Sequence, residues 1–160
     1  MFLIALSFAA HAHADTLKLN CKAKSSHTEM DEDDLKDNGN VDLRKFLAAK
    51  TATISISDTT ATLAIKGSVQ GKLEAYSNKN LKKRGLVGYA NDKLALVDDS
   101  YGAHFSLFAK ADDLKKVQSG DKKSVSVRAW TAAVSEPEDD SGAQPLFNNS
   151  NLNLSCSLAK

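Results

Sequence analysis

Three clusters of polar side chains in this 160-residue sequence have the composition of chemical sites. The first is the acidic segment of residues 29–42, which carries seven Asp and Glu side chains and a single basic one, Lys36. Oxygen-rich clusters of this kind bind hard cations such as Ca²⁺. The candidate metal ligands are Asp31, Asp33, Asp34 and Asp37.

The spacing of this segment does not match an EF-hand. Aligning Gly39 with the invariant glycine of an EF-hand loop places Lys36 at position 3 and Lys45 at position 12, where ligands are required. A solvated acidic loop is therefore the preferred interpretation, with an irregular calcium site as the alternative. Calcium is the one cofactor that the sequence suggests.

The second cluster is "VDDSYGAHF", a strand-to-strand turn whose candidate ligand-binding or metal-binding residues are Asp98, Asp99, Ser100, Tyr101 and His104. A Ser-His-Asp arrangement needs a histidine, and after residue 14 the chain has only His27 and His104. The preferred explanation is conformational, because turns select Asp, Ser and Gly for their backbone preferences alone.

The third cluster is the basic run "NKNLKKRG", in which Lys82, Lys83 and Arg84 are candidates for contact with an acidic partner such as a polyanionic glycan or an acidic protein face. An ordinary charged loop is the simpler interpretation. No aromatic residues alternate with these cations, and the formal net charge is only +1, so a nucleic-acid partner is not expected.

Recognised enzyme motifs do not occur in the chain. It has no Gly-x-Ser-x-Gly elbow, no His-Glu-x-x-His sequence and no glycine-rich phosphate loop. Paired carboxylates could still hydrolyse a glycoside without a histidine. A non-catalytic role is favoured.

Residues 1–14, "MFLIALSFAAHAHA", form an apolar run that ends in a small-x-small sequence, which is typical of a signal peptide cleaved before Asp15. The run is too short to span a membrane. We therefore expect one β domain over residues 15–160, exported to the periplasm or secreted, without membrane insertion. An outer-membrane barrel is disfavoured, because only 6% of the residues are aromatic.

The two cysteines, Cys21 and Cys156, each follow a Leu-x-Leu-x pattern near one end of the chain. In an exported protein such a pair favours a disulfide over two separate thiols. The matched patterns predict that the first and last strands lie side by side.

Alternation of apolar and polar residues with period two dominates the remainder and predicts eight or nine strands. In residues 125–133, for example, Val125 and Val127 face the core while Arg128 and Trp130 face outwards. In the last strand the predicted inward residues are Leu152, Leu154, Cys156 and Leu158. The segments "GLVGYAND" (residues 85–92) and "KLALVDD" (residues 93–99) are expected to form a hairpin about Asn91-Asp92.

Helix is expected in one or two short segments. Residues 111–120 have Asp112 as a candidate N-cap, Leu114 and Val117 facing inwards, and Gly120 at the C-terminal end. Residues 40–50 place Leu43, Phe46 and Leu47 at helical spacing. Val41 and Leu43 also alternate as in a strand, so a short helix is preferred with a strand as the alternative.

The predicted fold is a single-domain, all-β antiparallel barrel or closed sandwich of about eight strands, with the first and last strands adjacent. Such a scaffold favours an exported binding module for a small ligand or a protein partner. A secreted hydrolase inhibitor and a carboxylate-based hydrolase are the alternatives.

Overall fold

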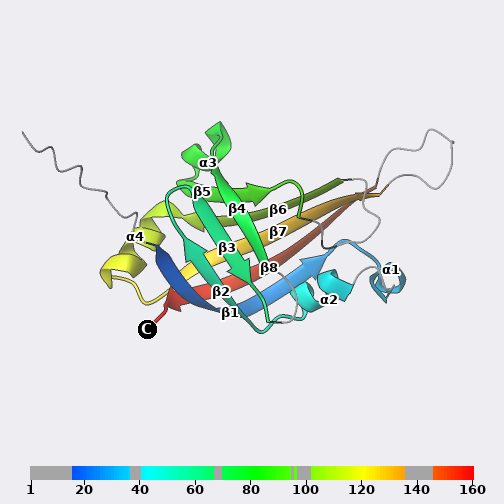
Figure 1. The fold of residues 1–160 in the computed structure, drawn as a ribbon, viewed down its shortest axis with the longest axis horizontal. Helices are drawn as coiled ribbons and strands as arrows, with labels where there is room; N and C mark the ends of the chain where they lie inside the picture. Colours follow the sequence, from blue (N-terminus) through cyan, green and yellow to red (C-terminus); the bar gives the residue numbers. More distant parts are fainter. Residues whose placement is uncertain (1–15, 37–40, 67–69, 95, 97–101, 136–145) are drawn as a thin grey trace, which may run out of the picture.

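The computed structural model describes residues 16–36, 41–66, 70–94, 96, 102–135 and 146–160. The predicted signal peptide, residues 1–14, lies outside the described residues. The described part of the chain forms a closed antiparallel barrel in which each strand pairs with the next and the last pairs with the first (Figure 1). The predicted fold class is confirmed. The eight strands are β1 (Leu17–Thr28), β2 (Thr51–Ile56), β3 (Thr60–Ala64), β4 (Gln70–Tyr76), β5 (Leu86–Asn91), β6 (Gly102–Lys110), β7 (Val125–Ser135) and β8 (Leu146–Leu158).

Side chains fill the interior of the barrel. Most inward residues of the strands are those that the period-two pattern predicts, and they form one hydrophobic cluster. Large side chains from different strands are almost fully buried there, including those of Leu19, Ile54, Leu63, Phe105, Leu107, Leu152 and Leu154. Leu158 is an exception to the prediction, because it is 46% exposed at the end of β8.

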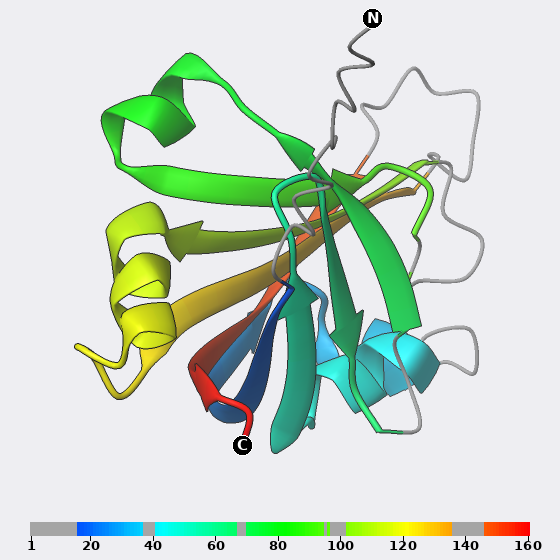
Figure 2. The same ribbon diagram turned by 60° about the vertical axis from the view of Figure 1, so that its left-hand side comes forward.

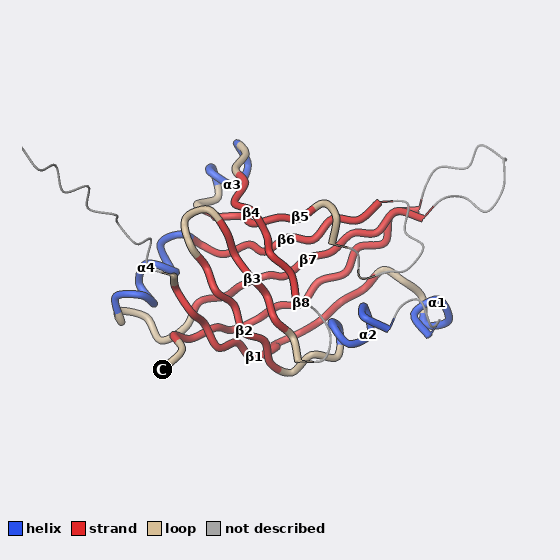
Figure 3. The backbone as a smooth tube through the Cα atoms, in the orientation of Figure 1, coloured by secondary structure: helices blue, strands red, loops and turns tan. Residues whose placement is uncertain are grey.

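Two helices close opposite ends of the barrel (Figure 3). Helix α2 (Val41–Leu47) inserts Leu43 and Phe46, and the Phe46 ring packs edge-on against Phe105 with 5.8 Å between centroids. Helix α4 (Ala111–Ser119) buries Leu114 and Val117 at the other end. Because both ends are plugged by side chains of the core cluster, the barrel is a packed structure.

The disulfide joins the two ends of the described chain. Cys21 on β1 lies directly opposite Cys156 on β8, with 4.0 Å between their Cα atoms and an S–S distance of 2.07 Å. Both residues are buried. The predicted pairing and the predicted adjacency of the first and last strands are confirmed. A structural disulfide of this kind fits an oxidising compartment.

The predicted hairpin about Asn91-Asp92 is wrong in its second strand. Strand β5 pairs with β6, and the described residues of segment 93–99 belong to no strand. The side chain of Asn91 accepts a hydrogen bond from the backbone N–H of Lys93 at 2.8 Å, which turns the chain away from the sheet. Leu94 and Leu96 then pack against the core instead of pairing.

The helices also differ from the prediction in detail. Asp112 is not an N-cap, because β6 runs without a loop into α4 and places Lys110 at that position. Gly120 does end α4, with φ of 86°. Two further helices, α1 (Glu32–Lys36) and α3 (Lys79–Lys83), bring the number in the described residues to four. None of these helices is long and apolar enough to cross a membrane.

Candidate functional site

One row of outward-facing residues crosses five strands of the barrel. The strand register places Tyr76, Gly88, Phe108, Arg128 and Asn153 opposite one another, from β4 to β8. These residues alternate with inward core residues along their strands, so their side chains lie on the outer wall. A surface in contact with water needs only polar side chains, so the aromatic residues of this row call for another explanation.

Gly88 allows two side chains to approach the backbone of β5 on this wall. A Cβ atom at this position would lie 2.9 Å from Leu81 Cδ1 and 2.9 Å from Tyr76 Cε1. Leu81 comes from α3, which projects beside β5 at the same end of the molecule as α4 (Figure 2). The Asn78 side chain caps α3 by accepting a hydrogen bond from the Leu81 N–H at 2.9 Å. The absence of a side chain at Gly88 therefore determines how α3 packs on the wall.

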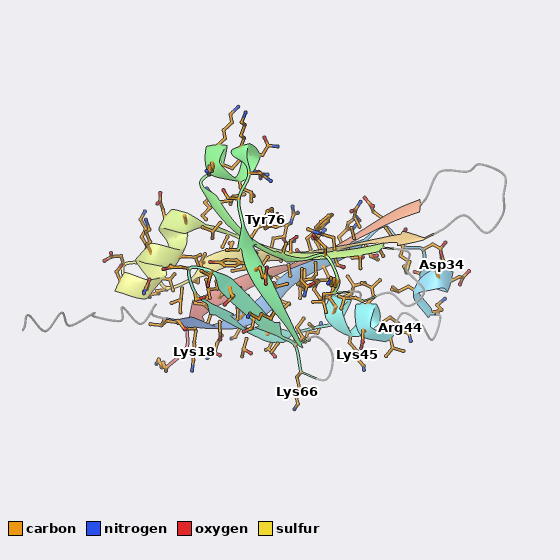
Figure 4. All side chains as sticks on the ribbon, turned by 45° about the horizontal axis from the view of Figure 1, so that its top comes forward. Lys18, Asp34, Arg44, Lys45, Lys66 and Tyr76 are labelled. Carbon is orange, nitrogen blue, oxygen red and sulfur yellow. A yellow bond between two sulfur atoms is a disulfide. The ribbon has the colours of Figure 1, made fainter. Side chains whose placement is uncertain are left out.

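A cleft of about 700 Å³ lies on this wall beside α3. We call it the aromatic cleft, because Tyr76, Phe108 and Trp130 line it, and the rings of Tyr76 and Phe108 pack edge to face at 6.2 Å. Figure 4 shows Tyr76 on the α3 side of the barrel, away from Lys18 and Lys66. The other lining residues include Asn78, Asn80, Leu81, Ser126 and Asn153.

The charged residues of the aromatic cleft are all basic. Lys24, Arg84, Lys110 and Arg128 line it, and no Asp or Glu does. None of the four forms an ion pair with a carboxylate of the described residues. Arg128 Nε instead donates a long hydrogen bond, 3.4 Å, to the side-chain oxygen of Asn153. Lys122 lowers the pKa of the Asp113 carboxyl through a hydrogen bond, and Lys110 lies near enough to that carboxyl to help lower its pKa. Lys24, Arg84 and Arg128 have no carboxylate partner among the described residues, so they are available to an anionic ligand.

A chain of hydrogen bonds lies on the same wall next to the cleft. His104 Nδ1 is bonded to the carboxylate of Asp92, and His104 Nε2 is bonded to the hydroxyl of Ser106. The His104 ring also packs against Trp130, with 5.3 Å between centroids. These hydrogen bonds hold the His104 ring in place, and His104 in turn positions Trp130, which lines the aromatic cleft.

This connectivity is that of a Ser-His-Asp triad, but its accessibility is reversed. In a working triad the serine faces the substrate and the aspartate is buried. Here Ser106 is 0% exposed, whereas the Asp92 side chain is 81% exposed. The arrangement thus supports a positioning role for His104 rather than nucleophilic attack by Ser106.

The Tyr76 hydroxyl stays protonated at neutral pH. Burial raises the pKa of Tyr76 above its ordinary value of 10.0, and the nearby Asp92 charge adds to this rise. A hydrogen bond with Ser106 opposes it and lowers the pKa of Tyr76. Tyr76 therefore contributes a neutral phenol to the cleft.

The structure separates the residues that the sequence analysis grouped together. Arg84 lines the aromatic cleft, but Lys82 and Lys83 are exposed on α3 and do not line it. His104 lies in the hydrogen-bonded chain with Asp92 and Ser106. The remaining predicted members of its turn, Asp98, Asp99, Ser100 and Tyr101, lie outside the described residues.

The acidic segment has a structural role at the start of α1. The Asp31 carboxylate accepts hydrogen bonds from the backbone N–H groups of Asp33 and Asp34, at 3.0 and 2.9 Å. Asp33 is also paired with Lys36 at 3.3 Å. The fourth candidate ligand, Asp37, lies outside the described residues. Within the described ranges, no group of three or more His, Cys, Asp or Glu residues is arranged to hold a metal ion.

Sequence reasoning missed Phe108, Arg128 and Trp130 as site residues. The signal was present, because alternation already placed Arg128 and Trp130 on the outward face of β7. Of the two partners of His104, only Ser106 could have been predicted from the sequence. Ser106 is two residues from His104 and shares its face, whereas Asp92 approaches through the β5–β6 pairing.

The chain matches no protein-family model, and no curated protein or solved structure shows significant similarity to it. The functional interpretation therefore depends on the geometry of the wall and its cleft.

Proposed function

We propose that this protein is an exported, non-catalytic binding module whose ligand occupies the aromatic cleft and combines a flat apolar face with negative charge. The observation that supports this proposal most directly is the lining of the cleft. Three aromatic side chains and four basic ones face one concave surface that contains no acidic side chain. Pockets of this kind, mostly apolar with a few placed polar groups, are the usual sites for small ligands.

The ligand binds outside the barrel in this proposal. The interior is occupied by core side chains, and α2 and α4 plug its ends. The aromatic cleft also lacks the pair of carboxylates that glycoside hydrolysis uses. Binding without catalysis is therefore favoured over a carboxylate-based hydrolase at this site.

The disulfide and the leader sequence support export of the protein to an oxidising compartment. Cys21 and Cys156 are bonded, as is common in exported proteins and rare in the cytosol. Together with the signal-peptide pattern of residues 1–14, this favours a periplasmic or secreted protein.

Trp130 is the only tryptophan in the sequence, so its fluorescence reports on the cleft alone. We would titrate the purified protein with p-toluenesulfonate and, as an uncharged control, with p-toluenesulfonamide. We expect a saturable change with the sulfonate and a much weaker response to the sulfonamide, because only the former satisfies the basic side chains.

Two charge variants sharpen this test. Arg128→Gln should weaken sulfonate binding by about fivefold, because it removes a charge-assisted contact in the cleft. Lys18→Gln removes the same charge from the outer face of β1, outside the aromatic cleft, and should have little effect. If the sulfonate and the sulfonamide bind equally, or if neither gives a saturable signal, the proposal is wrong.

A further inference from the structure

A second cleft, of about 830 Å³, lies on the outer surface formed by β1, β2, β3 and β8. We call it the hydroxyl cleft, because its lining is rich in side-chain hydroxyl groups, from Thr51, Thr53, Ser124, Ser155 and Ser157. Its charged residues are Lys22, Lys24 and Lys66, again with no Asp or Glu. None of these three lysines is paired with a carboxylate in the described parts of the chain.

Lys24 lines both clefts. It occupies a β-bulge, since the register of β1 with β8 shifts between Ala23, opposite Leu154, and Ser25, opposite Asn153. The extra residue of a bulge is unpaired, and bulges often redirect a side chain next to a binding site. The bulge therefore places a cation where the two clefts meet.

We propose that the two clefts form one continuous track for a linear acidic glycan, with Lys24 at the junction. This inference depends on the proposed function of the aromatic cleft and names the class of its ligand. Arg84, Lys110 and Arg128 lie on one side of the junction, and Lys22 and Lys66 lie on the other. A ligand with negative charges spaced along a chain matches this distribution.

The side chains between the cations favour a sugar chain over a nucleic acid. Proteins that bind single-stranded nucleic acid stack successive bases on aromatic side chains along the strand. The aromatic residues here are confined to one cleft, and none lines the other. Hydroxyl and amide groups, which line the second cleft, are suitable partners for the hydroxyl groups of sugars.

The test compares chain lengths and two acidic chemistries. Binding of heparin-derived oligosaccharides (sulfated) and of oligogalacturonates (carboxylate only) would be measured by calorimetry, from disaccharide to octasaccharide. We expect the octasaccharide of at least one series to bind about tenfold more tightly than its disaccharide, because it engages both clefts at once. The series that binds identifies the acidic group.

A matched pair of variants tests the second half of the track. Lys22→Gln/Lys66→Gln should weaken octasaccharide binding by about fivefold or more and reduce its salt dependence. Lys82→Gln/Lys83→Gln removes the same charge from exposed positions of α3 that line neither cleft, and should change the affinity by less than about twofold. Circular dichroism of both variants checks that the barrel is intact.

The outcomes separate this inference from the proposed function. If p-toluenesulfonate binds at Trp130 but affinity does not increase with glycan length, the aromatic cleft acts alone and the track is rejected. Equal effects of the two double variants would reject it as well, as would tighter binding of a single-stranded oligonucleotide of equal charge. If p-toluenesulfonate does not bind at all, both proposals fail.

Discussion

The barrel has two outer walls that follow the same alternation but carry different side chains. On β1, β2 and β3 the outward residues are mostly exposed Lys, Thr and Asn, such as Lys18, Asn20, Thr53 and Thr62, and none of these four makes a side-chain hydrogen bond within the described residues. On β6, β7 and β8 the outward residues include His104, Phe108, Trp130 and Asn153, which are all partly buried. His104 packs against Trp130, Phe108 packs against Tyr76, and Asn153 accepts a hydrogen bond from Arg128.

This difference between the two walls shows which side-chain features follow from exposure to water alone. An outward side chain needs only to be polar, and Lys18, Asn20, Thr53 and Thr62 meet that condition without side-chain hydrogen bonds in the described part of the chain, although the hydroxyl cleft lies on the same wall. Lateral hydrogen bonds and edge-to-face rings restrict side-chain rotamers, which costs conformational entropy that solvation does not require. The ordering of the β6–β8 wall is therefore consistent with a surface prepared for a ligand.

The largest effect is expected where the two walls meet, at the disulfide between β1 and β8. Cys21→Ala/Cys156→Ala should lower the free energy of unfolding by about 2–4 kcal/mol, because the cross-link constrains a loop that spans nearly the whole unfolded chain. Urea denaturation measures the change. Reduction of the wild-type protein provides an independent comparison, and a loss below about 1 kcal/mol in both experiments would show that the seam is held by strand pairing alone.

A smaller effect is expected from placing a new methyl group on each wall, at the crowded Gly88 and at the exposed Thr62. Gly88→Ala should cost about 1–3 kcal/mol, because its Cβ would overlap Leu81 and Tyr76 and displace one of them. Thr62→Val replaces a hydroxyl by a methyl group of similar size on an exposed position of β3 and should cost less than about 0.5 kcal/mol. Thermal denaturation of the two variants compares the walls directly. Equal losses of stability in the two variants would contradict the difference between the walls.

The hydrogen-bonded chain gives a third comparison. Ser106→Ala leaves His104 without its Nε2 partner and should cost about 1–2 kcal/mol, whereas Thr53→Ala on the other wall should be close to neutral. The variant should also raise the pKa of Tyr76 further, because the Ser106 hydrogen bond normally lowers it. Ultraviolet titration of the phenolate measures this shift.

The raised pKa of Tyr76 also makes stability depend on pH. Its contribution is fully present below the unfolded value of about 10 and is lost as pH rises towards the folded value, since the unfolded chain ionises first. Ser106→Ala should widen this interval. If the pKa of Tyr76 instead falls in the variant, the Ser106 hydroxyl does not stabilise the phenolate, and the hydrogen bond between Ser106 and Tyr76 is contradicted.

The smallest effect is expected at the acidic segment, which belongs to neither wall. Millimolar Ca²⁺ should leave the melting temperature unchanged, because Asp31 is engaged with the backbone of α1 and Asp33 with Lys36. A site at one hundred times its dissociation constant would add about 2.7 kcal/mol, which a melting experiment detects easily. A calcium-dependent rise would restore Asp31, Asp33, Asp34 and Asp37 as ligands.

The sequence by itself determined a closed antiparallel β-structure, a barrel or a sandwich with adjacent first and last strands, and the disulfide; the structure shows that it is a barrel. Side-chain alternation is a local property of an extended chain, so the inward faces of β7 and β8 could be identified without knowing their neighbours. The matched patterns before Cys21 and Cys156 then placed the first and last strands together. The leucines of residues 93–99 were misread, because the same apolar residues can pair in a strand or cover a core.

Only the tertiary structure decided where the site lies. The aromatic cleft combines outward residues of β4 to β8 with α3, and its composition depends on the register between strands that are far apart in the sequence. The position of Lys24 depends on a bulge, and the approach of Leu81 to β5 depends on Gly88. Alternation states which face a residue occupies, but it does not state which residues of other strands share that face at the same height. That information comes from hydrogen-bond register, which forms only when the barrel closes.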